Sequence, residues 1–216
     1  LSAYTVSVFV ASGQAEISYF MVVLALLLLI LVTEIFRSTE LPFDNLAHTF
    51  FGALYVAVPF SIFPFLAYGF DGIPSILSSG SSDFSPGLLM GSFILSWSFD
   101  TGAYLFGSWF GKNKLMERIS PEKSWEGFFS GMMIAVLIAW PLSLWLGYPG
   151  TRSWVLIAVI ISITGTLGDL LESRLKRVAG VKDSGSILPG HGGILDRFDS
   201  LILSLPFVFL YLILFG

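Results

Sequence analysis

The chain has 216 residues, of which 55% are hydrophobic and 12% are charged, and its mean hydropathy is +0.83. Soluble domains carry about twice that share of charged residues, so the composition excludes an ordinary soluble domain and predicts an all-α polytopic membrane protein. The formal net charge of −4 indicates no particular partner, because the placement of charges matters more here than their sum. The sequence contains no cysteine, which excludes disulfides and thiolate metal sites.

Apolar runs of roughly 20 residues mark helices that can cross a bilayer. They predict a transmembrane helical bundle of about six spans, at 17–36, 46–69, 87–110, 125–147, 153–172 and 198–216. The second span contains Pro59 and Pro64, which predict a kink or a break. Residues 1–11 are expected to form a short interfacial helix or the remnant of an earlier span, and 71–86 a loop rich in Gly, Ser and Pro.

The predicted organisation has two regions, an N-terminal set of hydrophobic spans over 1–90 and a catalytic transmembrane region over 91–216. The second region contains two polar loops, 111–124 and 173–197. The chain begins with Leu1 and not with Met, so we expect further N-terminal sequence in the whole protein. No cleavable signal peptide is apparent.

The lysines and arginines predict the orientation of the spans. With six spans, ten of the eleven basic residues lie on one side, in 37–45 and in the two polar loops, and Arg152 lies on the other. The positive-inside rule makes the first side cytoplasmic. The polar loops, and any active-site cavity between them, are therefore expected to face the cytoplasm.

Asp100 lies inside a predicted span, in the run ILSWSFDTGAYLFGSWFGK. Ionisable residues at such positions are costly and usually serve a function or pair within a polar cavity. The alternative is a structural hydrogen-bonding role beside Ser96, Ser98 and Thr101.

Another polar group stands near the end of the fifth span, in TGTLGDLLESRLKR. On a helix one face carries Asp169, Glu172, Ser173 and Lys176. Two carboxylates one turn apart can bind a divalent cation, and Gly165 and Gly168 allow another backbone to come close. The alternative is a helix end at the membrane surface, stabilised by i,i+4 pairing of Glu172 with Lys176.

The stretch KDSGSILPGHGGILDRFDS, residues 182–200, is the most polar part of the chain. His191 is surrounded by Pro189, Gly190, Gly192 and Gly193, so the backbone there is bent and its N–H groups suit phosphate. Asp196 and Asp199 follow at the start of the last span, where acidic residues also favour the helix dipole. Mixed acids and bases beside a glycine-rich turn indicate a metal–phosphate site, with Mg²⁺ held by the acids.

The loop 111–127 is expected on the same side, and it contains SPEKSWEG. Ser124 is placed to cap the following helix, with Glu126 in its first turn. Lys123 and its neighbouring lysines either contact an anion at that helix end or serve only as a positive-inside signal, and the residues alone leave both readings open.

The segment SRLKRVAGVKDSGSILPGHGGILDRFDS, residues 173–200, resembles the signature of the phosphatidate cytidylyltransferases, also called CDP-diacylglycerol synthases. The matching positions are Ser173, Lys176, Arg177, Lys182, Asp183, Gly185, Pro189, Gly190, His191, Gly192, Gly193, Asp196, Arg197 and Asp199. The upstream ISPEKSWEG and GDLLES also resemble family motifs. The resemblance is strong over 96–200, whereas 1–90 is similar only in being hydrophobic.

The resemblance implies a Mg²⁺-dependent reaction in which CTP and phosphatidic acid give CDP-diacylglycerol and pyrophosphate. It implies one or two metal ions held by Asp169 and Asp196, with Glu172 as a further ligand and a monovalent ion as an additional candidate. The triphosphate would be held by Lys176, Arg177, Lys182 and Arg197, and the nucleotide lined by His191, Gly192 and Gly193. Further substrate contacts are expected from Asp100, Lys123, Ser124, Glu126, Ser173, Asp183 and Asp199.

The resemblance also favours a homodimer, and a chain this compact fits a bacterial inner membrane.

Three alternatives compete with this interpretation. The CDP-alcohol phosphotransferases are excluded because their D-G-x2-A-R-x8-G-x3-D-x3-D pattern does not occur. A cation-coupled transporter would also explain Asp100 and Asp169, but it needs no dense phosphate-binding loop. A purely structural scaffold is disfavoured, because nothing would compensate the free-energy cost of placing so many charges near hydrocarbon.

Overall fold

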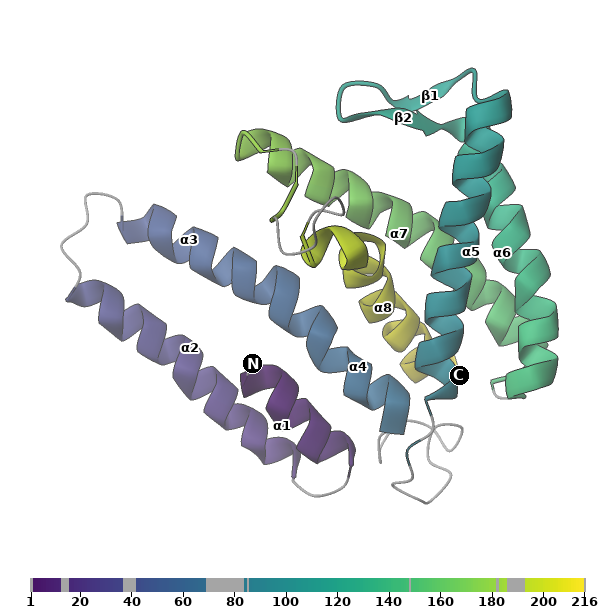
Figure 1. Cartoon of the computed structure of the whole chain (residues 1–216). Helices are drawn as coiled ribbons and strands as arrows, with labels where there is room; N and C mark the ends of the chain where they lie inside the picture. Colours follow the sequence, from purple (N-terminus) through teal and green to yellow (C-terminus); the bar gives the residue numbers. More distant parts are fainter. Residues whose placement is uncertain are drawn as a thin grey trace. The chain divides into compact units, whose positions relative to one another are not determined.

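The computed structural model of the chain describes residues 2–12, 16–36, 42–68, 84, 86–147, 149–181, 183–185 and 193–215. The roles predicted for Lys182, His191 and Gly192 lie outside the described residues. Over the described part, the chain is helical except for one two-stranded hairpin (Figure 1), so the all-α prediction is confirmed. The chain forms two compact units, Leu1–Pro86 and Gly87–Gly216. The predicted regions, 1–90 and 91–216, were distinguished by function, and the boundary between the two compact units does not test that distinction.

The first unit begins with a short helix, α1, over Ser2–Ala11, at the place where a short interfacial helix was expected. After a 3₁₀ turn over Ile17–Tyr19, helix α2 runs over Phe20–Ile35. The helix α3, Pro42–Gly52, continues through a π-helical segment, Ala53–Ala57, into α4, Val58–Tyr68. Helix α1 packs on α4, and Phe20 stacks on Phe65 with ring centroids 6.3 Å apart.

Of the kink or break predicted at the prolines of the second span, the break does not occur, because the chain stays helical through Pro59 and Pro64. The distortion takes another form, the five-residue π-helical segment that ends directly before Val58. Proline lacks the N–H that would bond to the carbonyl one turn earlier, and a local π-helical adjustment is one way to accommodate this in a membrane helix.

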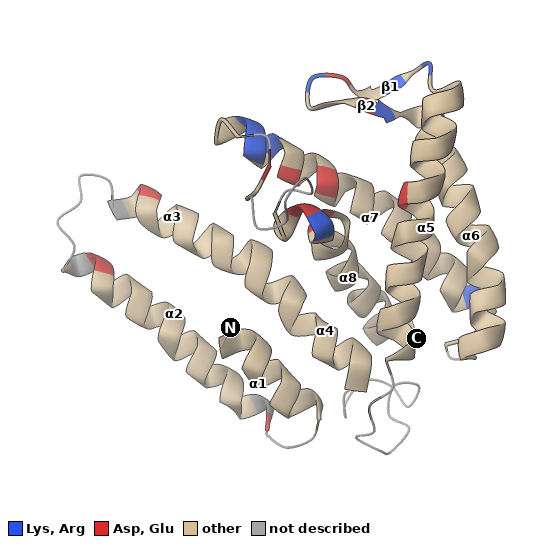
Figure 2. Cartoon of the chain, in the orientation of Figure 1, with Lys and Arg blue, Asp and Glu red and all other residues tan. Residues whose placement is uncertain are grey.

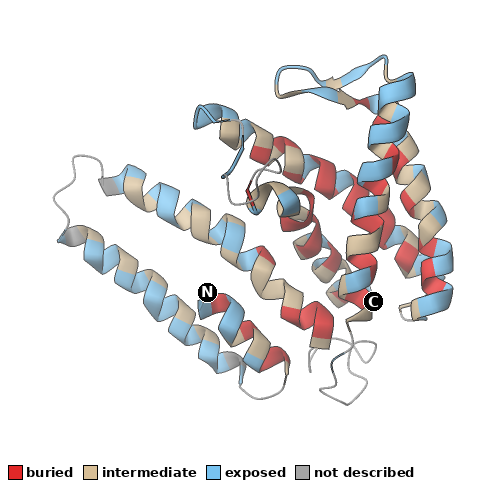
Figure 3. Cartoon of the chain, in the orientation of Figure 1, coloured by how far each residue is buried: buried red, intermediate tan, exposed pale blue. Residues whose placement is uncertain are grey.

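The second unit contains four long helices and the hairpin. Its elements are α5 (Gly87–Phe110), β1 (Lys114–Met116), β2 (Ser120–Ser124), α6 (Trp125–Leu146), α7 (Thr151–Val178) and α8 (Leu195–Phe215). Helix α5 packs on α6, α6 on α7 and α7 on α8. Figure 3 shows the buried residues of this unit on the faces that these helices turn toward one another, with Trp154, Leu95 and Leu205 fully enclosed.

Residues 111–124 were expected to be a loop, but they form the antiparallel hairpin. Lys114 pairs with Ser124 and Met116 with Ser120, and the turn is closed by the Ile119 N–H donating to the Met116 carbonyl at 3.1 Å. The hairpin leads directly from the end of α5 into α6 and places β2 at one end of the four-helix unit (Figure 1).

Glycines let these helices approach closely. A Cβ on Gly131 of α6 would lie 2.7 Å from the Phe99 carbonyl oxygen of α5, and one on Gly127 would lie 2.7 Å from the Ala103 carbonyl oxygen. A Cβ on Gly168 of α7 would lie 2.5 Å from the Asp199 carbonyl oxygen of α8, which confirms the close backbone approach predicted there. Small residues in this spacing are typical of helix contacts in membranes. They bring the backbones that carry the site near to one another.

All six predicted spans are helical in the described residues. Four helices are long and apolar enough to cross a membrane: Phe43–Tyr68, Trp125–Leu146, Thr151–Val178 and Leu195–Phe215. The chain is therefore an integral membrane protein. The number six is not confirmed, since α2 has 16 residues and α5 carries Asp100 with several serines and glycines that lower its hydropathy.

The charges of the second unit gather at one end. Figure 2 shows blue and red segments on the hairpin, on the C-terminal part of α7 and on the first turn of α8. Arg152 lies in the first turn of α7, at the opposite end of that helix. This arrangement agrees with the asymmetry of Lys and Arg in the sequence.

Candidate active site

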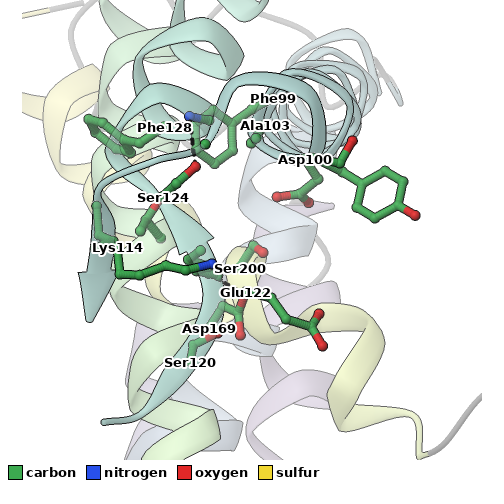
Figure 4. Close-up of a pocket in the computed structure, with 18 of the residues that line it drawn as sticks. Phe99, Asp100, Ala103, Lys114, Ser120, Glu122, Ser124, Phe128, Asp169 and Ser200 are labelled. Carbon is green, nitrogen blue, oxygen red and sulfur yellow. Dashed lines mark hydrogen bonds and ion pairs between the residues drawn. The ribbon is translucent and has the colours of Figure 1, made fainter. Parts of the chain in front are cut away.

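A cavity of about 760 Å³ lies in the second unit, between α5, the hairpin and the first part of α6 on one side and α7 and α8 on the other. The charged residues that line it are Asp100, Lys114, Glu122, Lys123, Asp169, Asp196 and Asp199. Figure 4 shows Asp100, Glu122 and Asp169 among the side chains that line this cavity. Among the described residues, five carboxylates and two lysines thus face one cavity, whose size suits a small-molecule substrate.

Asp169 joins α7 to the hairpin across this cavity. Its Oδ2 forms an ion pair with Nζ of Lys123 on β2, and its Oδ1 accepts a hydrogen bond from the Ser173 hydroxyl at 3.2 Å. The hairpin therefore delivers a lysine to a carboxylate that the membrane helix holds at the wall of the cavity. Residues that the sequence analysis placed in two separate polar segments are in direct contact here.

Asp100 and Asp199 face the same ion pair. The charges that act on the Asp100 carboxyl are those of Asp199, Lys123 and Asp169, which come from α8, β2 and α7. The Asp199 carboxyl accepts hydrogen bonds from the backbone N–H of Ser200 at 2.6 Å and from its hydroxyl at 3.2 Å. Like-charged groups placed together in this way favour the uptake of a cation.

Ser124 caps α6 as predicted, with its Oγ accepting a hydrogen bond from the Gly127 N–H at 3.2 Å, and it is buried at the wall of the cavity. Glu126 lies in the first turn of α6, also as predicted, but it is not among the residues that line the cavity. Its carboxylate accepts hydrogen bonds from the backbone N–H groups of Lys112 and Asn113, each at 3.2 Å, and from the Asn113 side chain at 2.6 Å. Glu126 thus fixes the base of the hairpin to α6.

Asn113 is a residue that the sequence analysis missed. It is exposed, and a single asparagine after a glycine in a charged segment is more typical of a turn than of a site. Its contact with Glu126 depends on the end of α5 lying beside the start of α6, which no local pattern reveals.

Asp196, in the first turn of α8, is surrounded by donors. Its Oδ1 accepts from Lys176 Nζ at 2.6 Å, and its Oδ2 accepts from the Ser184 N–H at 2.9 Å, the Ser184 hydroxyl at 2.8 Å and the Gly193 N–H at 2.7 Å. A Cβ on Gly193 would lie 2.8 Å from the Gly185 backbone nitrogen, so this position requires glycine. One carboxylate therefore holds α7, Ser184 and Gly193 together.

Glu172 is buried beside this network, with 1% of its surface exposed. Lys176 Nζ lies 3.5 Å from its Oε1, so the predicted i,i+4 pairing is confirmed. Neither carboxylate oxygen accepts a hydrogen bond from the described residues. Glu172 is not among the residues that line the cavity.

The remaining predicted residues lie at the same end of the unit. Arg177 is exposed in the last turn of α7, and Arg197 is exposed in the first turn of α8. Asp183 is exposed next to Ser184, whereas Ser173 is half-buried and bonded to Asp169 as described above. The two arginines and Asp183 are exposed at this end, and none of them is among the residues that line the cavity.

Comparison with known proteins identifies this architecture. The model of the cytidylyltransferase family matches residues 1–215. The chain belongs to this family. The predicted family resemblance is confirmed, and its extent is corrected, because the match includes the N-terminal spans that seemed similar only in hydrophobicity.

Bacterial relatives of the same name match this chain over different lengths. The phosphatidate cytidylyltransferase of Bacillus subtilis (strain 168) is 39% identical over 213 residues, which are 97% of this chain and 73% of that protein. The proteins of the same name from Staphylococcus epidermidis (strain ATCC 12228) and Staphylococcus aureus (strain COL) are 48% identical over 124 residues. Those matches cover 56% of this chain and 47% of the staphylococcal proteins.

Proposed function

We propose that this protein transfers the cytidylyl group of CTP to phosphatidic acid, giving CDP-diacylglycerol and pyrophosphate in a Mg²⁺-dependent reaction. Family membership and the names of its relatives support the reaction type and the two substrates. The observation that carries the proposal is the cavity that Lys123 lines together with Asp100, Asp169 and Asp199 in a membrane protein, with Lys123 paired to Asp169. The transporter alternative finds no support in these relatives.

The chemistry requires positioning and charge neutralisation more than a strong base. A phosphate oxygen of phosphatidic acid, already anionic, attacks the α-phosphorus of CTP. The bond between that phosphorus and the oxygen bridging to the β-phosphate breaks, and pyrophosphate leaves with the electron pair. The residues of the cavity must hold two anionic substrates in line and stabilise the charge on the leaving group.

The residues of the cavity fit Mg²⁺. No three acidic or histidine side chains among the described residues converge as a ready-made metal site. Mg²⁺ is usually held by one or two carboxylates and completes its coordination with water and substrate phosphates, so Asp169 with Asp196 or Asp199 would suffice for one ion or two. When bound, the metal neutralises phosphate charge and fixes the triphosphate in place.

Basic residues would hold the phosphates. Lys123 and Lys114 line the cavity, and Lys123 is paired with Asp169. A triphosphate would bind Lys123 in place of Asp169, whose carboxylate would then be available to hold the cation. Arg177 and Arg197, exposed at the same end, would meet the nucleotide from the aqueous side. Lys182 and His191 keep the roles proposed for them from the sequence.

We place the cavity at the cytoplasmic surface of the membrane. Helix α7 has 28 residues and is about 42 Å long, so it exceeds the hydrocarbon thickness of about 30 Å and its polar C-terminal part extends beyond it. Exposed Trp125 and Trp145 lie about 30 Å apart along α6, the spacing expected for the two interfaces. A lipid phosphate at headgroup level would then reach Asp169.

The basic residues at this end indicate that it faces the cytoplasm, and the bacterial relatives agree with a bacterial membrane, for which we propose the cytoplasmic (inner) membrane. We also expect a homodimer, for which the exposed aromatic residues on α5 and α6 offer an apolar surface. Chemical cross-linking in native membranes should give a band at twice the chain mass.

The reaction type is tested by the fate of two radioactive labels. The purified chain is incubated with phosphatidic acid, Mg²⁺ and CTP labelled either on the α- or on the γ-phosphate. Label from the α-phosphate should enter the lipid, label from the γ-phosphate should leave in pyrophosphate, and chelation of Mg²⁺ should stop both. Transfer of the γ-label to lipid would indicate a kinase, and an absence of transfer from the folded protein would contradict the proposal.

Asn113→Ala should raise the KM for CTP a few-fold with little change in kcat. The substitution removes the side-chain donor to Glu126 and keeps the backbone one, so the hairpin is held less firmly and Lys123 is placed less accurately. Steady-state kinetics with varied CTP measure this, with Glu117→Ala on the exposed hairpin turn as the control. A fall in kcat at unchanged KM would show that the contact between Asn113 and Glu126 affects the chemical step instead.

A further inference from the structure

Glu172 is a buried carboxylate to which the described residues donate no hydrogen bond. It is 1% exposed, and among the described residues neither of its oxygens receives a donor. Lys176 Nζ is 3.5 Å from Oε1, which is longer than a hydrogen bond between an ammonium and a carboxylate. Asp196 and Asp199 face the same carboxylate from α8. A carboxylate in such surroundings is costly, so its function calls for an explanation.

Lys176 lies between two carboxylates and is bonded more closely to one. Its Nζ is 2.6 Å from Asp196 Oδ1 and 3.5 Å from Glu172 Oε1. The other oxygen of Asp196 already accepts three hydrogen bonds, from Ser184 and Gly193. A cation that approaches Asp196 therefore meets the oxygen that Lys176 occupies.

We propose that Lys176 is a positioning residue that exchanges partners, neutralising Asp196 in the empty cavity and moving to Glu172 when a divalent cation binds Asp196. The proposal rests on the proposed function, because it takes the cation that accompanies a nucleotide as the ligand of the cavity. Glu172 precedes Lys176 by one helical turn, so rotation about the end of the flexible lysine side chain brings Nζ to hydrogen-bonding distance. The oxygens of Glu172, which accept no hydrogen bond from the described residues, are the acceptors that the displaced ammonium needs.

The exchange explains why a carboxylate that does not line the cavity stands at this position. Without Glu172, a cation would expel Lys176 from Asp196 with no second carboxylate to receive it, and the ammonium and the cation would repel each other. With Glu172, the ammonium stays paired in both states, while Ser184 and Gly193 keep the orientation of Asp196 unchanged. Glu172 acts on the cation through Lys176 and does not bind it.

The test is a double-mutant cycle on Mn²⁺ binding to the full chain in detergent, read from the electron paramagnetic resonance signal of free Mn²⁺. The proteins are the wild type, Glu172→Gln, Lys176→Met and the double variant. Glu117→Gln, on the exposed hairpin turn, controls for the loss of one negative charge. Thermal unfolding without metal shows that each variant is folded.

Glu172→Gln should weaken Mn²⁺ binding about tenfold in the wild-type background, a coupling of the size found between contacting charged residues. In the Lys176→Met background the same substitution should have a much smaller effect, because the group through which Glu172 acts is gone. Glu117→Gln should leave binding unchanged.

Three results would overturn the exchange. Equal weakening by Glu172→Gln in both backgrounds would mean that Glu172 acts on the cation directly, and no weakening in the wild-type background would mean that it does not act at all. A wild-type chain that binds no Mn²⁺ would also contradict it. The labelled-CTP assay on the same preparation tests the proposed function separately, so cytidylyl transfer without coupling refutes the exchange alone, and coupling without transfer refutes the function alone.

Discussion

Asp169→Asn is expected to lower the rate of cytidylyl transfer by about a hundredfold or more while the protein remains folded. Asparagine keeps the size of the side chain and removes the charge that pairs with Lys123 and that would hold the cation at the wall of the cavity. The loss should appear in kcat, measured with saturating CTP and phosphatidic acid. Thermal unfolding in detergent should change little, because the Asp169 side chain is only part-buried.

The control for this prediction is Glu117→Gln, which removes a carboxylate from the exposed turn of the hairpin. It should retain full activity. Near wild-type kcat in Asp169→Asn would remove Asp169 from the reaction centre, and a variant that loses activity and stability together would indicate a structural role.

Gly131→Leu should destabilise the second unit by about 1–3 kcal/mol and abolish transfer. A Cβ at this position would lie 2.7 Å from the Phe99 carbonyl oxygen and 2.9 Å from the Ala103 backbone nitrogen, so a larger side chain must push α5 away from α6. The cavity loses its shape as a result, because Phe99, Asp100 and Ala103 of α5 form part of its wall. The melting temperature and the transfer rate of the purified protein measure the two effects.

Gly52→Leu is the matched substitution. A Cβ on Gly52 would meet nothing within 4 Å, and its φ of −61° is an ordinary helical value, so the melting temperature should not fall below that of the wild type. If Gly131→Leu were equally harmless, the close packing of α5 on α6 would not be what holds the cavity together.

The helices could be predicted from the sequence because long apolar runs in a membrane protein leave few other structures. Their ends were less well predicted. The span expected at 153–172 is a helix over Thr151–Val178, because its last polar residues continue the helix past the point where hydrophobicity stops. The hairpin was not predicted. Its two strands are short, they do not show the alternation of apolar and polar residues that marks a strand, and β2 contains Pro121.

The candidate residues could also be predicted, but their contacts could not. An aspartate inside a span or a charged run beside a glycine-rich turn stands out in an oily sequence, which is how Asp100, Asp169 and Asp196 were identified. The pairing of Lys123 with Asp169 depends on how β2 is placed relative to α7, and spacing along the chain does not contain that information. Likewise, Lys176 lies between Asp196 and Glu172, and its contact with Asp196 of α8 could not be read from the spacing along the chain.

Anomalous diffraction from crystals of the chain grown with CTP and Mn²⁺ tests the central claim most directly. We expect a Mn²⁺ peak beside the Asp169 carboxylate, in the cavity between α5, the hairpin, α7 and α8, with the triphosphate in contact with Lys123. Nucleotide and metal bound outside this cavity would contradict the assignment of the site.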